Sequence, residues 1–324
     1  MTKTFYFFPL ICIWILKMIS LNKYKGCFLG LAMGDAFGAP YEGGPLEQLL
    51  WRAIGKTRDG KLRYTDDTQM AIDLAESYLY NDTIDQNHLA QTFAQSYQWS
   101  RGYGPSTSQL LRLIKKGKNW REANKKKFKT GSFGNGAAMR ASILAMCFPY
   151  NVQTLLNSVI KSAEITHAHP LGIEGAKLIA RATQAAFQDL DNEKILAELF
   201  HQCQSKIYKD KIIFCTEALN KPNIKVSEIK KQLGNGIAAP QSCVTAIYFS
   251  LQFRDQKFNS MLNKIIGLGG DTDTIASMAG SIWGAFNGNQ SLNQEAKNIE
   301  KWEKIDQISK DLFERIHPKH HQTL

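Results

Sequence analysis

Two short acidic segments are the first places in this sequence where side chains could do chemistry. Thr65-Asp66-Asp67-Thr68 places two adjacent carboxylates between hydroxyls, at the start of an apolar-periodic stretch. Asp271-Thr272-Asp273-Thr274 follows a glycine pair and also leads into an apolar stretch, so its two carboxylates can face one point. One aspartate at a helix start is an ordinary cap. Two neighbouring carboxylates are more than a cap requires, and they repel each other unless a cation lies between them.

The donor atoms of these segments indicate a hard cation. Oxygen ligands without neighbouring Cys or His favour Mg²⁺ before Ca²⁺ and argue against zinc. The Asp-x-Asp spacing also resembles the nucleophile loop of haloacid-dehalogenase phosphatases, but that loop follows a strand and has Thr or Val where this chain has Ile275. Only their shared chemistry suggests that the two segments meet. If they do, they form a site for two cations that can bind a nucleophilic water and lower its pKa.

A glycine-rich segment and two histidines are further candidates. Residues 131–140 read Gly-Ser-Phe-Gly-Asn-Gly-Ala-Ala-Met-Arg. Such a turn before a helix presents backbone N–H groups to an anion such as phosphate, and Phe133 could stack on a base. A plain flexible helix entry explains the same glycines equally well. His167 and His169 could be ligands or an acid–base pair, although loop histidines of this kind more often bond to backbone.

The elements that must position these residues are helical. Only four valines occur in the chain, and the alternation typical of strands is rare. Apolar spacing predicts helices over residues 69–80, 142–147, 172–187, 244–253 and 275–286. Glycine-rich turns are expected at 30–44, 131–136, 234–236 and 267–270. The sequence therefore predicts an all-α, multi-helix bundle in which small residues such as Gly280 and Gly284 let helices pack closely.

Composition describes an ordinary globular protein with a basic balance. Hydrophobic residues are 44% and charged residues 21% of the 324, which excludes a disordered or fibrous chain. The net charge of +11 favours polyanionic ligands, but solvated lysines explain it as well. Because no nucleic-acid motif accompanies the charge, we expect no nucleic-acid partner. The six cysteines include no Cys-x-x-Cys, so we expect free thiols in a reducing, cytoplasmic compartment.

The two ends of the chain differ from the rest. Residues 1–20 form an apolar extension that falls short of the about 20 apolar residues of a membrane span. It lacks a signal-peptide cleavage site, so we interpret it as an extension upstream of the true start at Met18 rather than as a membrane or secretion signal. Residues 21–316 read as one domain without linkers, and 317–324 as a tail containing His317, His320 and His321. We expect a monomer without stable membrane association.

Four motifs follow one another along the chain. They are Gly26-Cys27-Phe28-Leu29-Gly30 running to Gly34-Asp35-Ala36 and Gly38-Ala39-Pro40-Tyr41-Glu42; Thr65-Asp66-Asp67-Thr68; Gly134-Asn135-Gly136-Ala137-Ala138-Met139-Arg140; and Gly269-Gly270-Asp271-Thr272-Asp273-Thr274. Together they resemble the ADP-ribosylglycohydrolase family, which includes the dinitrogenase-reductase-activating glycohydrolases. The resemblance covers roughly residues 24–314 and implies the family fold, an all-α bundle with two Mg²⁺ ions.

Within the family, the chain looks most like the ADP-ribosylhydrolase 3 (ADP-ribosylserine hydrolase) type. The stretches behind this likeness are Asp67-Thr68 through Arg101-Gly102-Tyr103-Gly104, the glycine-rich 131–136 segment, and Leu233 to Ala239 continuing into Thr245-Ala246-Ile247-Tyr248. Glu42 after Tyr41 also fits that type. Pro105-Ser106-Thr107 and His169-Pro170 look more like generic bacterial members and lie near the expected acceptor side.

The resemblance implies a role for each matching position. Thr65, Asp66, Asp67 and Asp273 would hold one Mg²⁺, and Asp271, Asp273 and Thr274 the other. Glu42 resembles a mobile glutamate that alternates between metal and substrate, and with Asp66, Asp67 and Asp273 it would be catalytic. The implied ADP-ribose contacts are Gly102, Gly104, Gly131, Ser132, Phe133, Gly134, Asn135, His167 and Ile237.

The function implied is Mg²⁺-dependent hydrolysis of the C1″ glycosidic bond of O-linked ADP-ribose, in serine-linked protein, poly-ADP-ribose or O-acetyl-ADP-ribose. The reaction develops oxocarbenium-like charge on the ribose. One alternative keeps the chemistry and changes the acceptor to N-linked arginine. Another is a non-catalytic ADP-ribose-binding or crystallin-like protein, which would be expected to have damaged metal motifs; both motifs are intact here.

Overall fold

The computed structural model describes residues 19–125, 129–221 and 224–318, and these residues fold into helices without a strand. The all-α fold expected from the sequence is thereby confirmed. The α-helices are α1 (Leu21–Gly38), α2 (Pro45–Ile54), α3 (Asp66–Asn81), α4 (Gln86–Ser96), α5 (Pro105–Lys115), α6 (Trp120–Lys125), α7 (Ala141–Cys147), α8 (Val152–Glu164), α9 (Pro170–Phe187), α10 (Asn192–Gln202), α11 (Lys206–Leu219), α12 (Val226–Leu233), α13 (Ala239–Gln252), α14 (Phe258–Leu268), α15 (Thr272–Asn287), α16 (Asn293–Ala296) and α17 (Trp302–Ile316). Short 3-10 turns cover Ala39–Tyr41, Trp99–Arg101 and Asn135–Ala137.

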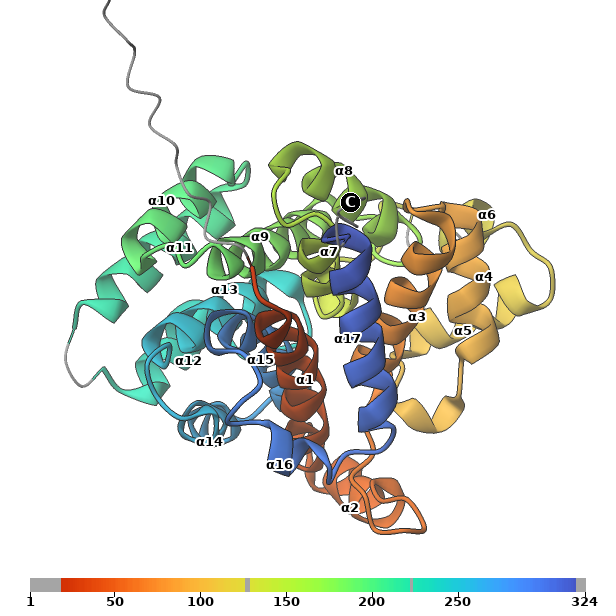
Figure 1. The fold of residues 1–324 in the computed structure, drawn as a ribbon, viewed down its shortest axis with the longest axis horizontal. Coiled ribbons are helices and arrows are strands. Elements are labelled where there is room, and N and C mark those ends of the chain that lie inside the picture. The colour runs from red at the N-terminus through yellow and green to blue at the C-terminus, as the bar shows by residue number, and fades with distance from the viewer. Residues whose placement is uncertain (1–18, 126–128, 222–223, 319–324) are drawn as a thin grey trace, which may run out of the picture.

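Helices α1 and α15 form the centre of the molecule and cross with their backbones in contact (Figure 1). Gly26 lies against Gly284, Gly30 against Gly280, and Gly34 against Ala276, so the two helices run antiparallel. A side chain at any of these glycines would overlap a backbone carbonyl of the partner helix. Most of α1 and α15 is therefore buried.

The prediction of a turn over residues 30–44 is wrong for the first half of this range, which is helical. Gly30, Gly34 and Gly38 lie inside α1, and the chain turns only after them, at Ala39–Tyr41 and the residues that follow. Each glycine weakens a helix relative to alanine by about 1 kcal/mol. Here the four-residue spacing puts the glycines on one face, where close packing against α15 offsets that cost.

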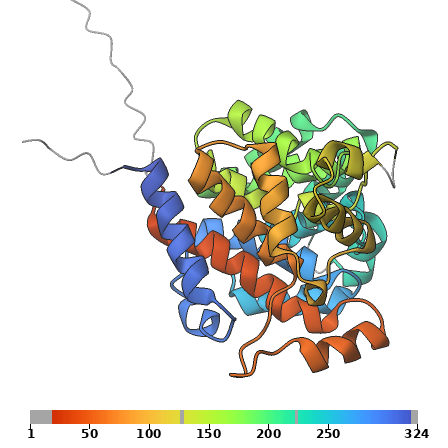
Figure 2. The ribbon, with the colours of Figure 1, turned by 90° about the vertical axis from the view of Figure 1, so that its right-hand side faces the viewer.

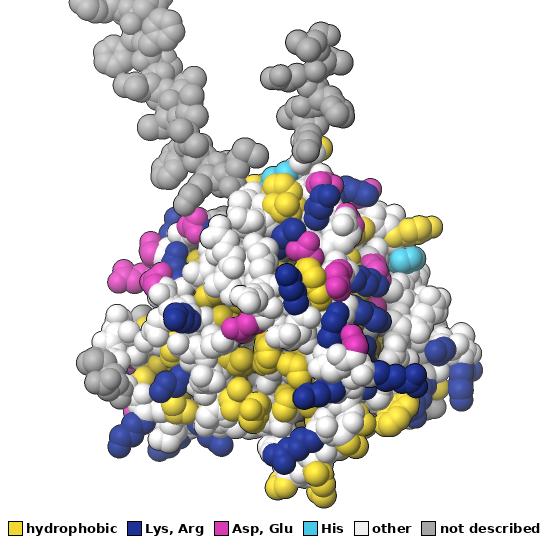
Figure 3. Space-filling model, turned by 60° about the horizontal axis from the view of Figure 1, so that its bottom comes forward, with side chains coloured by type: hydrophobic (Ala, Val, Ile, Leu, Met, Phe, Trp, Pro, Cys, Tyr) yellow, Lys and Arg dark blue, Asp and Glu magenta, His cyan; other side chains and the backbone are white. Residues whose placement is uncertain are grey.

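The other helices surround this pair (Figures 1 and 2). Helices α3 to α6 lie on one side and α10 to α14 on the other, while α17 packs along α1. None of the helices among the described residues combines the length and the apolarity that crossing a membrane demands. On the face in Figure 3, Lys and Arg side chains are dispersed among apolar ones and do not merge into one continuous stripe.

The packed region extends slightly beyond the domain limits expected from the sequence. Ile19 is buried and Ser20 caps α1, although both were assigned to the apolar extension; residues 1–18 lie outside the described part of the chain. At the other end, His317 stacks on Phe313 and pairs with the Tyr150 hydroxyl, so it is not part of a tail. Residues 319–324 are also outside the described part.

The predicted helices are present, and all five begin one to five residues earlier than their apolar pattern. α3 begins at Asp66 because the Thr65 hydroxyl accepts a hydrogen bond from Asp67 N, 3.3 Å away. α9 and α13 begin near prolines, Pro170 and Pro240, which are well suited to a first helical turn. Polar caps and proline extend these helices beyond the residues that face the core.

The glycine contact between α1 and α15 can be tested by Gly30→Ala. The added methyl group overlaps the Gly280 carbonyl, so we expect the free energy of unfolding to fall by about 3 kcal/mol. Urea denaturation measures the change. Gly267→Ala in α14 is the matched control, because nothing lies within 4 Å of the new methyl and the helix should gain about 0.5–1 kcal/mol. Equal effects of the two substitutions would contradict the close crossing.

Candidate active site

One cavity of about 440 Å³ collects both acidic segments and the glycine-rich loop. It is formed by the N-terminal ends of α3, α5 and α15, the loop after α1, and the loops before α7 and α13. Its lining residues are Glu42, Asp66, Asp67, Met70, Gly102, Gly104, Pro105, Ser106, Thr107, Ser132, Phe133, Gly134, Asn135, Gly136, Met139, His167, Ile237, Ala238, Asp271, Asp273 and Thr274. The four aspartates singled out from the sequence thus face one space.

The antiparallel crossing brings the late acidic segment to Glu42. The C-terminal end of α1 meets the N-terminal end of α15, where the Thr272 hydroxyl donates to the Gly38 carbonyl at 3.0 Å. The Gly43 N–H then donates to the Gly270 carbonyl at 3.2 Å. As a result, carboxylate oxygens of Glu42, Asp271 and Asp273 lie within 4.8 Å of one another.

The early acidic segment is held by a buried carboxylate of α1. Asp35 accepts hydrogen bonds from Thr65 N at 2.9 and 3.0 Å, from Thr68 N at 3.0 Å and from the Thr68 hydroxyl at 2.5 Å. It therefore caps α3 from a neighbouring helix and fixes the loop that contains Asp66 and Asp67. The Thr274 hydroxyl lies 3.4 Å from an Asp67 oxygen, which joins the two acidic segments.

A second support holds the residue before the acidic pair. Glu300 accepts from Tyr64 N at 3.1 Å and forms an ion pair with the buried Arg101, which also donates to the Tyr64 carbonyl at 2.7 Å. Arg101 directly precedes Gly102, whose φ of +83° is readily adopted only by glycine. Arg101 thus ties the acidic loop to the 102–104 segment of the cavity wall.

Burial and mutual repulsion raise the pKa values of the clustered carboxyls. Burial followed by the charges of neighbouring carboxylates raises the pKa of Asp66, Asp67 and Asp273. Burial, then the charge of Asp271, raises the pKa of Glu42 to about 7. Asp67 Oδ2 is buried without a hydrogen-bond partner among the described residues. An orphaned carboxylate oxygen in a crowded acidic cluster fits a hard divalent cation as the missing partner.

Another part of the cavity lining has no formal charge. It includes Ser132, Phe133 and Gly134, and Phe133 is 51% exposed and meets the His169 ring at a steep angle. Gly134 lies against the His167 ring, where a side chain would crowd it. An exposed ring beside free backbone is suited to a planar base and its phosphates.

Asn135 connects the two parts of the lining. Its side-chain amide donates to an Asp271 oxygen and to the Ser242 hydroxyl, the latter at 3.0 Å. Its backbone N–H donates to the Ile237 carbonyl at 3.0 Å. The turn at Asn235 supports the same region, because the Asn235 carbonyl accepts from Asp271 N at 2.9 Å.

Two predicted site residues do not line the cavity. The Thr65 side chain is buried beneath the acidic loop, and the Gly131 backbone, with φ +85°, packs against Ala168 and His169. His169 instead caps α9, where its Nδ1 accepts from Leu171 N at 3.1 Å. It is therefore a histidine bonded to backbone, the simpler of the two interpretations given above. Cavity residues that the sequence did not single out as contacts include Met70, Pro105 to Thr107, Gly136, Met139 and Ala238.

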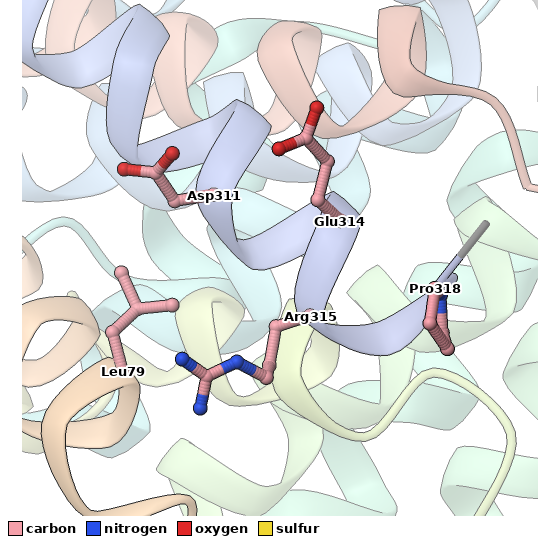
Figure 4. Close-up of a pocket in the computed structure, with 5 residues that line it drawn as sticks. All are labelled: Leu79, Asp311, Glu314, Arg315 and Pro318. Atoms are coloured by element: carbon pink, nitrogen blue, oxygen red, sulfur yellow. The ribbon is translucent and has the colours of Figure 1, made fainter. Parts of the chain in front are cut away.

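A second pocket lies at the surface between α3 and α17. It is lined by Leu79, Asp311, Glu314, Arg315 and Pro318. Figure 4 shows the carboxylates of Asp311 and Glu314 directed to one side of α17 and the Arg315 guanidinium to the other. These groups do not converge on one point, so the cavity between α3, α5 and α15 is the candidate active site.

Comparison with known proteins identifies the class that this fold and site define. Residues 17–322 match the family model for ADP-ribosylglycohydrolase. The chain belongs to this family and is a glycosidase.

Individual relatives refine the placement. The chain is 33% identical to ADP-ribosylhydrolase ARH3 of Bos taurus, with 90% of this chain and 93% of the relative covered. ADP-ribosylarginine hydrolase Tri1 of Pseudomonas putida is 23% identical over 91% of this chain and 79% of its own length. A solved structure described as an ADP-ribosylglycohydrolase-related protein complex shares the fold, with a TM-score of 0.66, 21% identity, and coverage of 90% of this chain and 97% of the other.

The raised pKa of Glu42 predicts how stability depends on pH and divalent cations. A carboxyl with a raised folded-state pKa stabilises the protein below its unfolded pKa, and this contribution is lost as pH rises through about 7. A cation that binds the ionised carboxylates should restore it. We expect Mg²⁺ to raise the thermal unfolding midpoint more at about pH 8 than at about pH 6. Burial also raises the pKa of Asp73 to about 7. Its effect on stability is the same with and without Mg²⁺, so it cancels when the two unfolding midpoints are compared at each pH. An equal shift at both pH values would contradict this account.

The capping role of Asp35 predicts a loss of both stability and cation affinity in Asp35→Asn. The amide directs its N–H donors at other donors, so the free energy of unfolding should fall by about 1–3 kcal/mol. Urea denaturation and calorimetric Mg²⁺ titration measure the two effects. Asp73→Asn is the matched control: it removes a buried carboxylate within α3, the helix that Asp35 caps, where it is bonded to Gln69 and Ser96, and it should leave Mg²⁺ affinity intact. Unchanged Mg²⁺ affinity in both variants would show that Asp35 does not position the acidic loop.

Proposed function

We propose that this protein is an Mg²⁺-dependent hydrolase that cleaves the C1″ glycosidic bond of O-linked ADP-ribose, with serine-linked protein as the first candidate substrate. Poly-ADP-ribose and O-acetyl-ADP-ribose have the same kind of bond. The observation behind the proposal is the meeting of two acidic segments with an uncharged nucleotide-sized pocket in one cavity.

We propose that the acidic residues hold two Mg²⁺ ions. Asp66, Asp67 and Asp273 would hold one, and Asp271, Asp273 and Thr274 the other, with Glu42 beside them. Thr65 is the further ligand expected for the first ion, although its buried side chain does not line the cavity. Such ions, when bound, orient the ribose hydroxyls and the attacking water and stabilise developing negative charge. The orphaned Asp67 Oδ2 and the proximity of the Glu42, Asp271 and Asp273 carboxylates support this assignment.

Residues of the chain supply the remaining steps. Glu42 lines the cavity beside the acidic pairs, so it is the candidate to protonate the leaving oxygen or to orient the water. Phe133 offers an exposed ring to the adenine, and Gly102, Gly104 and Gly134 leave their backbone accessible to the diphosphate. Holding the nucleotide at both ends places the scissile bond beside the acidic cluster.

The similarity of the chain to ARH3, at 33% identity, favours the O-linked acceptor over N-linked arginine, because the arginine hydrolase Tri1 is only 23% identical. Arginine-linked ADP-ribose remains the second candidate, since Pro105, Ser106 and Thr107 line the cavity where the O-linked type differs in sequence. A non-catalytic reader is disfavoured because every acidic residue of both metal motifs is present and faces the cavity.

Release of ADP-ribose from matched serine- and arginine-modified peptides tests the proposal. We expect rapid, Mg²⁺-dependent release from the serine peptide and at least about tenfold slower release from the arginine peptide. Asp273→Asn should lower the rate by about 10³-fold, because a cation ligand and its charge stabilisation are lost. Asp210→Asn on the exposed face of α11 is the matched control and should leave the rate unchanged. Faster arginine release, or full activity with excess chelator, would overturn the assignment.

A further inference from the structure

A buried hydrogen-bonded chain leads from Arg140 to the cavity. Arg140 is fully buried, and its Nη2 donates to the Thr166 hydroxyl at 2.9 Å. The same hydroxyl lies 2.8 Å from Nδ1 of His167. His167 is 7% exposed and lines the cavity, and its Nε2 has no hydrogen-bond partner within the described part of the chain. Its Nε2 edge lies against Gly134 and Gly136, where a side chain would collide with it.

The direction of the hydrogen bonds in this chain follows from the donors. A guanidinium has only donors, so Thr166 Oγ1 must accept from Arg140. If Nδ1 of His167 carried a proton, it would also donate to Oγ1, and the buried Thr166 hydroxyl hydrogen would have no acceptor among the described groups. All of these polar groups are paired only when the Thr166 hydroxyl donates its hydrogen to Nδ1 of His167. Nδ1 is then an acceptor, and the ring proton lies on Nε2, facing the cavity.

Further contacts keep Arg140 and the ring in place. Arg140 Nη1 donates to the Gly136 carbonyl at 2.6 Å and Nη2 to the Ser162 carbonyl at 2.9 Å, so the cation clamps the cavity turn to the end of α8. Burial, followed by the charge of Arg140, lowers the pKa of His167 to about 3. The imidazole is therefore neutral at physiological pH.

We propose that Arg140 and Thr166 are positioning residues that fix His167 as its Nε2–H tautomer, making it a permanent hydrogen-bond donor to an oxygen of the ligand in the cavity. The identity of that ligand as an ADP-ribosyl group rests on the proposed function. The donor is uncharged and cannot reverse its polarity, so it selects for acceptor atoms at this position. Thr166 and Arg140 need not touch the ligand to set this preference.

Nitrogen-15 NMR of histidine-labelled protein tests the tautomer directly. The His167 signals are assigned by their loss in His167→Phe. We expect the wild-type protein to show a protonated Nε2 and an unprotonated, hydrogen-bonded Nδ1. A protonated Nδ1 would overturn the proposal without any variant of Thr166 or Arg140, and without reference to activity.

Two substitutions of Thr166 test the relay. Thr166→Ser keeps the hydroxyl and should preserve both the tautomer and the affinity for ADP-ribose. Thr166→Val keeps the shape but removes the hydroxyl, so the NMR signals should show a changed tautomer and ADP-ribose binding should weaken about fivefold. Unchanged affinity or tautomer in Thr166→Val would contradict the relay. If wild-type protein with a protonated Nε2 fails to bind ADP-ribose, the proposed function fails and the tautomer assignment stands.

Discussion

The backbones of α1 and α15 approach so closely that side chains are excluded along one face of each helix, and the site depends on this contact. Gly30 and Gly280 share the crossing point, and an antiparallel arrangement pairs the end of α1 with the start of α15. Glu42 is thereby brought beside Asp271 and Asp273. The same helix α1 supplies Asp35, which holds the start of α3. One helix therefore aligns both acidic segments.

Collecting these carboxylates in a buried place opposes folding. Each carboxylate loses hydration and adds to the repulsion among the others, so the cluster favours protonation or a bound cation. The buried cation Arg140 has no carboxylate among its hydrogen-bond partners in the described part of the chain and donates instead to carbonyls and hydroxyls. Its positive charge therefore reduces the repulsion among the carboxylates only from a distance. Most of that repulsion remains. The rigid α1–α15 crossing supplies the packing that holds the carboxylates together despite it.

The sequence predicted the parts of the site that depend on local pattern. The acidic pairs were visible because two adjacent carboxylates exceed what a helix cap needs, and the core helices because their apolar residues recur with helical spacing. The glycines of α1 were misread as a turn because glycine signals turns locally, whereas here it serves a helix contact that only the folded chain defines. Asp35 belongs to the first family motif, but the sequence does not predict its role as a cap, and it does not single out Glu300 at all. Each is an acid whose partner, Thr65 or Tyr64, lies far away in the sequence.

Two parts of the cavity lining impose different electrostatic conditions on one ligand. At the acidic part, buried carboxylates repel an anion; at the uncharged part, neutral His167, Phe133 and the glycine backbone accept one without penalty. Asn135 follows the uncharged Phe133 and Gly134 directly in the chain, and its side chain donates to Asp271, so it links the two parts of the lining. A diphosphate beside an uncompensated cluster would be repelled. A cation or proton that neutralises the carboxylates therefore raises the affinity of the cavity for an anionic ligand. By reciprocity, a bound anionic ligand raises the affinity of the carboxylates for that cation or proton.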